Sequence, residues 1–112
     1  DLREAPSIDN IALLLKNGAD IVAYDPVAMN NFKKKFPEGA VERGTISYTE
    51  QIEEVLKDAN ICFIFTEWKK IKKVEPEAFI QLMRTPLVYD GRNIFDPEKM
   101  KAADVEYYSI GR

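Results

Sequence analysis

The stretch that decides the fold is Ile61-Cys62-Phe63-Ile64-Phe65, an apolar run that ends at the polar cluster Thr66-Glu67-Trp68. Two other short apolar runs also end at polar clusters: residues 21–24 before Asp25-Pro26, and residues 87–89 before Asp90-Gly91-Arg92-Asn93. Short apolar runs of this kind are typical of parallel strands that are buried on both faces. Ligands of open α/β sheets bind at the carboxyl ends of the strands, so the clusters predict a binding rim.

Helical patterns alternate with these runs. Ile8, Ile11, Ala12 and Leu15 recur at helical spacing, and Gly18 is expected to end that helix. Further helices are predicted from Pro26, after the capping residue Thr49, at 75–83 and at 97–100, and further strands at 46–48 and 105–109. The alternation predicts a Rossmann-like, three-layer αβα fold of the α/β class, with a mostly parallel sheet and one domain over residues 1–112. Because the chain opens on a helix, we expect the first strand of that fold to be missing.

The composition narrows the function. The 112 residues carry a net charge of −3, which argues against a nucleic-acid partner. No apolar stretch approaches the ~20 residues that cross a bilayer, so we expect no membrane partner and a cytoplasmic location. The chain has no histidine and one cysteine, which removes the commonest general base and metal ligands. The sequence therefore predicts no metal site and no catalytic residue of its own.

Two features have plain structural explanations. Cys62 lies within the most apolar run, so we interpret it as a buried structural cysteine. The lysines at 69, 70, 72 and 73 are interpreted as a solvated face.

The rim residues allow two readings each. Asp90 and Gly91 fit a tight turn, with Gly91 in a backbone conformation that other residues avoid. Arg92 is not explained by a turn, and its planar fork suits a phosphate. Trp68 either packs against protein or covers a planar ligand. Glu67 and Asn93 are predicted to lie at the rim, and the sequence assigns them no further role.

Two further candidates lie nearer the start of the chain. Asp25 either caps the helix after it or belongs to the rim. Arg3 either meets an anion at the amino end of the first helix or pairs with Glu4. The sequence has no GxGxxG motif, so it is not by itself a dinucleotide-binding unit.

Five phrases in register carry a resemblance over nearly the whole chain: Asp1-Leu2-Arg3-Glu4-Ala5-Pro6-Ser7, Ala23-Tyr24-Asp25-Pro26-Val27-Ala28-Met29, Thr66-Glu67-Trp68, Asp90-Gly91-Arg92-Asn93-Ile94 and Tyr107-Tyr108-Ser109-Ile110-Gly111-Arg112. Together they resemble the C-terminal, UDP-binding domain of the UDP-glucose/GDP-mannose dehydrogenase family, and within it the UDP-glucose 6-dehydrogenases. The resemblance implies that Arg92 contacts the nucleotide sugar and that Arg3 reaches NAD.

The resemblance also implies the activity of a whole enzyme. Such an enzyme oxidises UDP-glucose to UDP-glucuronate with two NAD, which are bound mainly by an N-terminal domain that this chain does not contain. Its partners are then UDP-glucose, NAD, the rest of the enzyme and a homo-oligomer. The catalytic cysteine also lies outside this chain, so the chain alone is expected to be inactive.

Two alternatives stay open. The substrate of the whole enzyme could instead be UDP-N-acetylmannosamine or GDP-mannose. The chain could also be a stand-alone nucleotide-binding or interaction module.

Overall fold

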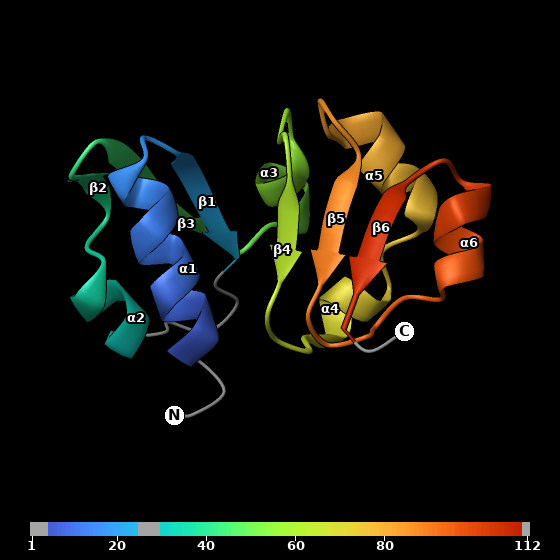
Figure 1. The fold of residues 1–112 in the computed structure, drawn as a ribbon, viewed down its shortest axis with the longest axis horizontal. Helices are drawn as coiled ribbons and strands as arrows, with labels where there is room; N and C mark the ends of the chain where they lie inside the picture. The colour runs from blue at the N-terminus through green and yellow to red at the C-terminus, as the bar shows by residue number, and fades with distance from the viewer. Residues whose placement is uncertain (1–4, 25–29, 111–112) are drawn as a thin grey trace. The chain divides into compact units, whose positions relative to one another are not determined.

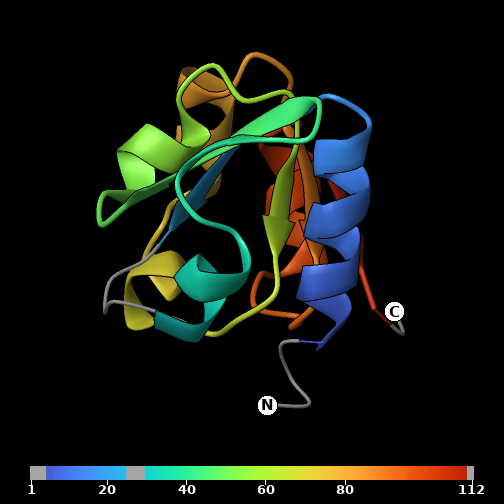
Figure 2. The ribbon, with the colours of Figure 1, turned by 90° about the vertical axis from the view of Figure 1, so that its left-hand side faces the viewer.

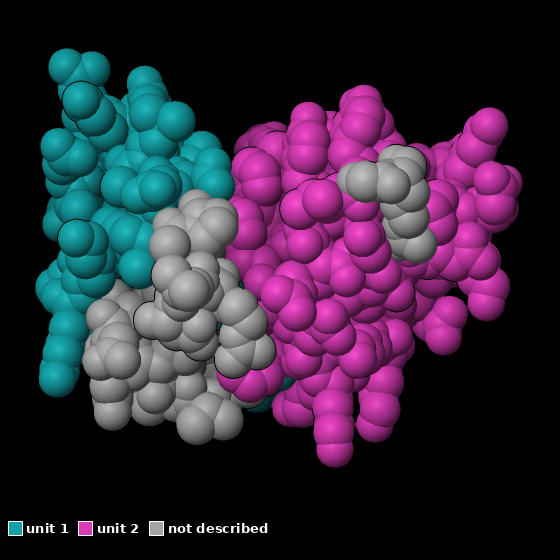
Figure 3. Space-filling view, turned by 60° about the horizontal axis from the view of Figure 1, so that its bottom comes forward, with its two compact units in different colours: residues 1–55 teal, residues 56–112 magenta. Residues whose placement is uncertain are grey.

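The computed structural model describes residues 5–24 and 30–110. The chain divides into two compact units, residues 1–55 and 56–112, which Figure 3 colours teal and magenta. Each unit has its own three-stranded sheet (Figure 1). Within the described ranges, no helix combines the length and the apolar character that a bilayer crossing requires.

The first unit is built on a mixed sheet. Its elements are α1 (Ala5–Lys16), β1 (Asp20–Tyr24), α2 (Asn30–Lys35), β2 (Gly39–Val41), β3 (Gly44–Thr49) and most of α3 (Ile52–Leu56). The strand order is β1-β3-β2, with β1 parallel and β2 antiparallel to β3. Figure 2 shows this unit from its side, with α1 in blue next to the green strands.

Helix α1 supplies one side of the first core. Ile11 and Leu15 pack with Phe36 and Ile46, while Ala12 is exposed, so the predicted apolar stripe is narrower than its spacing indicated. Gly18 follows the helix with φ +89°, a left-handed conformation that favours glycine. The predicted end of this helix is therefore confirmed.

The second unit is built on a parallel sheet. Its elements are β4 (Cys62–Ile64), α4 (Lys69–Lys72), α5 (Pro76–Leu82), β5 (Leu87–Asp90), α6 (Pro97–Ala102) and β6 (Glu106–Ser109). The strand order is β4-β5-β6, and both pairings are parallel. Figure 1 shows α5 behind this sheet. On the buried side, the rings of Phe79 and Phe95 meet edge to face at 5.5 Å.

The strands of the second sheet alternate between a buried and an exposed side. On β4, Cys62 and Ile64 are buried and Phe63 between them is exposed. On β5, Val88 is buried and Tyr89 after it is exposed. The exposed rings stack across the strands, with centroids 5.6 Å apart for Phe63 and Tyr89 and 5.0 Å apart for Tyr89 and Tyr108. The residues on the buried side therefore form the core, and an aromatic row lines the other face.

The structure confirms the α/β class and the mostly parallel pairing of the strands. It adds two elements that the sequence pattern did not predict, strand β2 and the short helix α4. The predicted helix start at Pro26 lies outside the described residues. Thr49 does receive a hydrogen bond just before α3, from the Gln51 backbone N–H at 3.1 Å.

Candidate functional site

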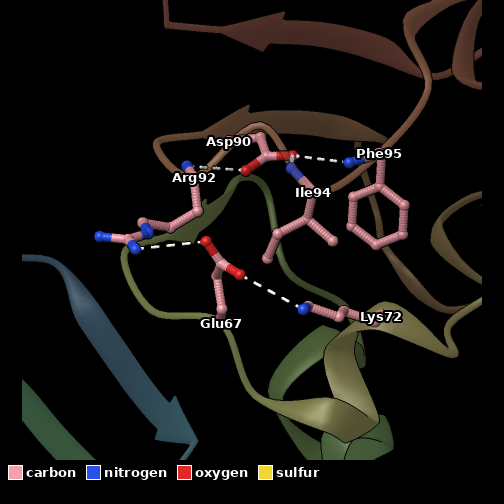
Figure 4. Close-up of polar contacts among 6 residues, drawn as sticks. All are labelled: Glu67, Lys72, Asp90, Arg92, Ile94 and Phe95. Atoms are coloured by element: carbon pink, nitrogen blue, oxygen red, sulfur yellow. Dashed lines mark hydrogen bonds and ion pairs between the residues drawn. The ribbon is translucent and has the colours of Figure 1, made fainter.

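Two of the predicted polar clusters meet at the carboxyl ends of β4 and β5. These strands are parallel neighbours, with Ile64 opposite Asp90. Glu67 follows β4 and Arg92 follows β5, and the Arg92 Nη2 donates to the Glu67 Oε1 at 3.2 Å (Figure 4). Residues 25 positions apart in the sequence are thus joined at one rim, as the strand ends predicted.

A third charged residue joins this pair. Lys72, at the end of α4, places its Nζ 3.3 Å from the Glu67 Oε2. The side chains of Arg92, Glu67 and Lys72 are 34%, 40% and 53% exposed. The hydrogen bond from Lys72, followed by that from Arg92, lowers the pKa of Glu67, which is therefore a carboxylate at neutral pH.

Asp90 is the last residue of β5 and holds the loop that carries Arg92. Its side chain is buried, and its Oδ1 accepts a hydrogen bond from the Arg92 backbone N–H at 3.0 Å. Its Oδ2 accepts from the backbone N–H groups of Ile94 and Phe95 at 2.8 and 3.1 Å (Figure 4). The same oxygen accepts from the Tyr107 hydroxyl at 2.6 Å. Because both oxygens accept hydrogen bonds, from the backbone of the loop and from a side chain of the neighbouring strand β6, Asp90 positions the rim.

The backbone of this loop corrects one prediction. The left-handed residue is Asn93, with φ 54°, and Gly91 has no positive φ. Gly91 instead makes a close approach, because its N–H donates to the Ile64 carbonyl at 2.9 Å and a Cβ would lie 3.0 Å from that oxygen, in a tight contact. The glycine therefore fastens the loop to the end of β4.

Trp68 is half-buried and directly precedes α4. Its carbonyl accepts hydrogen bonds from the backbone N–H groups of Ile71 and Lys72 at 3.1 and 3.3 Å. Trp68 thus stands between Glu67 and the helix that carries Lys72. Arg3 and Asp25, the two other candidates, lie outside the described residues.

Cys62 is a structural residue, as predicted. It is buried on β4, and burial, with a smaller contribution from Asp90, raises the pKa of its thiol to about 12. A thiol in this state is neutral at physiological pH and is not a nucleophile.

The cluster is suited to binding anions. Two cations share one exposed carboxylate. The described residues also contain no group of three or more acidic or cysteine side chains that could hold a metal ion.

Two residues of this region were not predicted. Lys72 belongs to the lysine stretch that was interpreted as a solvated face, and the exposure of Lys69, Lys70 and Lys72 fits that interpretation. The Tyr107 hydroxyl reaches Asp90 from the neighbouring strand β6. The alternation of the last strand could have indicated its inward direction, but nothing in the sequence indicates the contact of Lys72 with Glu67.

Comparisons with known proteins show the family of the chain. The family model described as the UDP-glucose/GDP-mannose dehydrogenase family, UDP binding domain, matches residues 1–97. The chain is 42% identical to the UDP-glucose 6-dehydrogenase YwqF and 36% identical to the UDP-glucose 6-dehydrogenase TuaD, both of Bacillus subtilis. It is 35% identical to a UDP-glucose 6-dehydrogenase of Pseudomonas aeruginosa.

These alignments cover the whole of this chain but only part of each relative. They span 24% of YwqF, 23% of TuaD and 24% of the Pseudomonas enzyme. The chain thus spans about a quarter of the length of the curated relatives it matches.

Proposed function

Because this chain belongs to the UDP-glucose/GDP-mannose dehydrogenase family and corresponds to its UDP binding domain, we propose that it holds the nucleotide sugar in a UDP-glucose 6-dehydrogenase. Arg92 is the residue that contacts the UDP-sugar. The observation that carries this role is its position at the carboxyl ends of two parallel strands, where only one guanidinium nitrogen is bonded to a described side chain.

The chain's own contribution is binding and orientation. Arg92 donates hydrogen bonds to an anionic oxygen of the nucleotide, and Asp90 fixes the loop from which Arg92 extends. A nucleotide held at this rim presents its sugar to reactive groups that lie elsewhere in the enzyme. The oxidation of UDP-glucose to UDP-glucuronate takes place there, with NAD as the oxidant.

NAD is held mainly by another part of the enzyme in this proposal. This is supported by the sequence, because the chain has no GxGxxG motif. Arg3 is proposed to reach NAD from this chain. In the full-length protein, Arg3→Ala should raise KM for NAD more than KM for UDP-glucose, and equal KM values for wild type and variant would contradict that role.

The decisive experiment concerns Arg92. In the full-length protein, Arg92→Ala should raise KM for UDP-glucose by about tenfold to a hundredfold, because a lost hydrogen bond to a charged group costs about 1.5–3 kcal/mol. Arg92→Lys should fall between wild type and Arg92→Ala, because lysine keeps the charge and loses the planar fork. Arg84→Ala, an exposed arginine of the same unit, is the matched control. An unchanged KM for Arg92→Ala would remove Arg92 from the site.

The proposal also covers the nucleotide sugar that is oxidised, the oligomeric state and the cellular location of the enzyme. UDP-glucose is favoured over UDP-N-acetylmannosamine and GDP-mannose because the similar proteins are named UDP-glucose 6-dehydrogenases. Turnover of the full-length enzyme on all three nucleotide sugars tests this choice. A homo-oligomer and a cytoplasmic location complete the proposal and can be checked by light scattering and cell fractionation.

A non-catalytic binding module is the remaining alternative. Full-length protein that binds UDP but turns over none of the three nucleotide sugars in the presence of NAD would favour it.

A further inference from the structure

We propose that Lys72 is a second anion-binding residue of this site, and that Glu67 is the positioning residue that holds Arg92 on one side of its carboxylate and Lys72 on the other. The two cations then receive the two phosphate groups of a nucleoside diphosphate. This inference rests on the proposed function and extends it to residues outside the predicted binding set.

The first support is the geometry of the carboxylate. Glu67 uses a different oxygen for each cation, with Oε1 3.2 Å from the Arg92 Nη2 and Oε2 3.3 Å from the Lys72 Nζ. Because both oxygens belong to one carboxylate, both cationic head groups are held in contact with the same side chain. Figure 4 shows them on opposite sides of Glu67, with the far end of the guanidinium pointing away from the carboxylate.

The second support is the balance of charges and donors. Two positive charges face one negative charge, so the cluster keeps an excess of one positive charge. Among the described side chains, Glu67 is the one hydrogen-bond or ion-pair partner found for the head groups of Arg92 and Lys72. An arginine has five donors and a lysine has three, so most of these donors are left for an anion.

The third support is the exposure of the cluster. Its three side chains are 34–53% exposed, and ion pairs as open as these contribute little to the stability of a fold. Arg92 lies in the loop after β5 and Lys72 lies in helix α4 after β4, so both cations follow neighbouring parallel strands, where α/β sheets bind nucleotides. A diphosphate brings two anionic groups, one for each of the two cations.

The test measures the affinity of the full-length protein for UDP and for UMP by titration calorimetry. Lys72→Met should weaken UDP binding by about tenfold and UMP binding by less than about threefold, because only UDP has the second phosphate. Lys70→Met, an exposed lysine of the same helix, should leave both affinities unchanged. Equal UDP affinity in wild type and Lys72→Met would overturn the role of Lys72.

Glu67 is tested by the sign of its effect. If Glu67 acted only as a nearby negative charge, Glu67→Ala would strengthen the binding of the anion UDP. As a positioning residue, it should instead weaken UDP binding by about threefold to tenfold, because Arg92 and Lys72 lose their common support. Stronger or unchanged binding in Glu67→Ala would overturn its positioning role.

A double variant distinguishes the positioning of the two cations by Glu67 from a general disturbance of the fold. With Lys72 already replaced by Met, Glu67→Ala should cost less UDP affinity than it does in wild type, because one of the two groups that it positions is gone. Fully additive losses would contradict the coupling. Thermal unfolding of each variant verifies that the fold is retained.

The outcomes also distinguish this inference from the proposed function. If Arg92→Ala weakens UDP binding and Lys72→Met does not, Arg92 keeps its role and the two-cation site is wrong. If Arg92→Ala leaves UDP binding intact, the assignment of the site itself fails.

Discussion

Asp90 links the stability of the chain to the position of Arg92, the residue proposed to bind the nucleotide. It is a buried acid whose two oxygens accept hydrogen bonds from three backbone N–H groups and from the Tyr107 hydroxyl. Hydrogen bonds to a charged group are stronger than those between neutral groups. The loop that presents Arg92 is therefore ordered by a residue that itself faces away from solvent.

The first prediction concerns this residue. Asp90→Asn should lower the free energy of unfolding by about 2–4 kcal/mol, because one carboxylate oxygen becomes an amide that cannot accept hydrogen bonds. Urea unfolding of wild type and variant gives this difference. Asp104→Asn, an exposed acid whose φ of 66° suits asparagine, is the control and should change little. A loss below about 0.5 kcal/mol for Asp90→Asn would show that the loop does not depend on the charge.

The Tyr107 hydroxyl offers a milder second test of the same network. Tyr107→Phe removes the hydroxyl that lies 2.6 Å from the Asp90 Oδ2 and keeps the ring. It should cost about 1–2 kcal/mol of unfolding free energy. Tyr108→Phe on the exposed side of the same strand, whose hydroxyl pairs with Glu106 in solvent, should cost less than half as much. Equal costs for both variants would contradict a special role for the buried hydroxyl.

At the scale of secondary-structure elements, Gly44 controls how closely α1 approaches β3. A Cβ at this position would collide with the Ala19 carbonyl oxygen and lie 3.0 Å from the Leu15 carbonyl oxygen. The Thr45 N–H donates to the same Ala19 carbonyl at 3.0 Å. The obstacles are backbone atoms, so they cannot move aside as a flexible side chain would.

A third prediction follows from this contact. Gly44→Ala should lower the melting temperature and cost about 1–3 kcal/mol, because the helix and the strand must separate to admit the methyl group. Thermal unfolding followed by circular dichroism measures the loss. Ser47→Ala on the exposed side of β3 is the control. A Gly44→Ala variant as stable as wild type would show that the packing of α1 on β3 is looser than described.

Elements with a clear hydrophobic pattern could be predicted from the sequence. The apolar runs before Asp25, Thr66 and Asp90 gave β1, β4 and β5, and Gly18 marked the end of α1. The hairpin of β2 and β3 was only half predicted, because its turn has Glu42 at φ 54° in place of the usual glycine or asparagine. Helix α4 has a single turn of lysines around Ile71, which is too short to show a period.

The candidate site was also predictable only where a local sequence pattern existed. The meeting of Glu67 and Arg92 follows from two parallel strands ending side by side, and the sequence pattern contained that information. The contact of Lys72 depends on where a one-turn helix begins, which no local pattern specifies. The sequence predicted an unusual φ angle at Gly91. The structure shows a different constraint, the close Ile64 carbonyl on another strand, which only the fold reveals.

At the scale of the whole molecule, one titrating group makes stability depend on pH. Burial raises the pKa of Cys62 from 9.0 to about 12, so the folded chain keeps its thiol proton where the unfolded chain releases it. The unfolded state then binds fewer protons than the folded state between these two values. The stability that comes from the neutral thiol is complete below pH 9.0 and decreases as the pH rises toward about 12.

The fourth prediction compares wild type with Cys62→Ala. Below pH 9.0 the difference in unfolding free energy between them should be constant, and above it the difference should shift against wild type by about 1.4 kcal/mol for each pH unit. Other titrating groups are common to both proteins and cancel in the difference. Urea unfolding at pH 7, 9 and 10 provides the values. A difference that stays constant through pH 10 would mean that the thiol is not desolvated as described.

The place of Trp68 has a practical consequence for optical spectroscopy. It is the single tryptophan of this chain, and it stands between Glu67 and the helix that carries Lys72. Light absorbed selectively by indole therefore excites one position of this chain, at the edge of the candidate site. The chain carries an intrinsic fluorophore there, whose emission can follow the arrival of a nucleotide in real time without any attached dye.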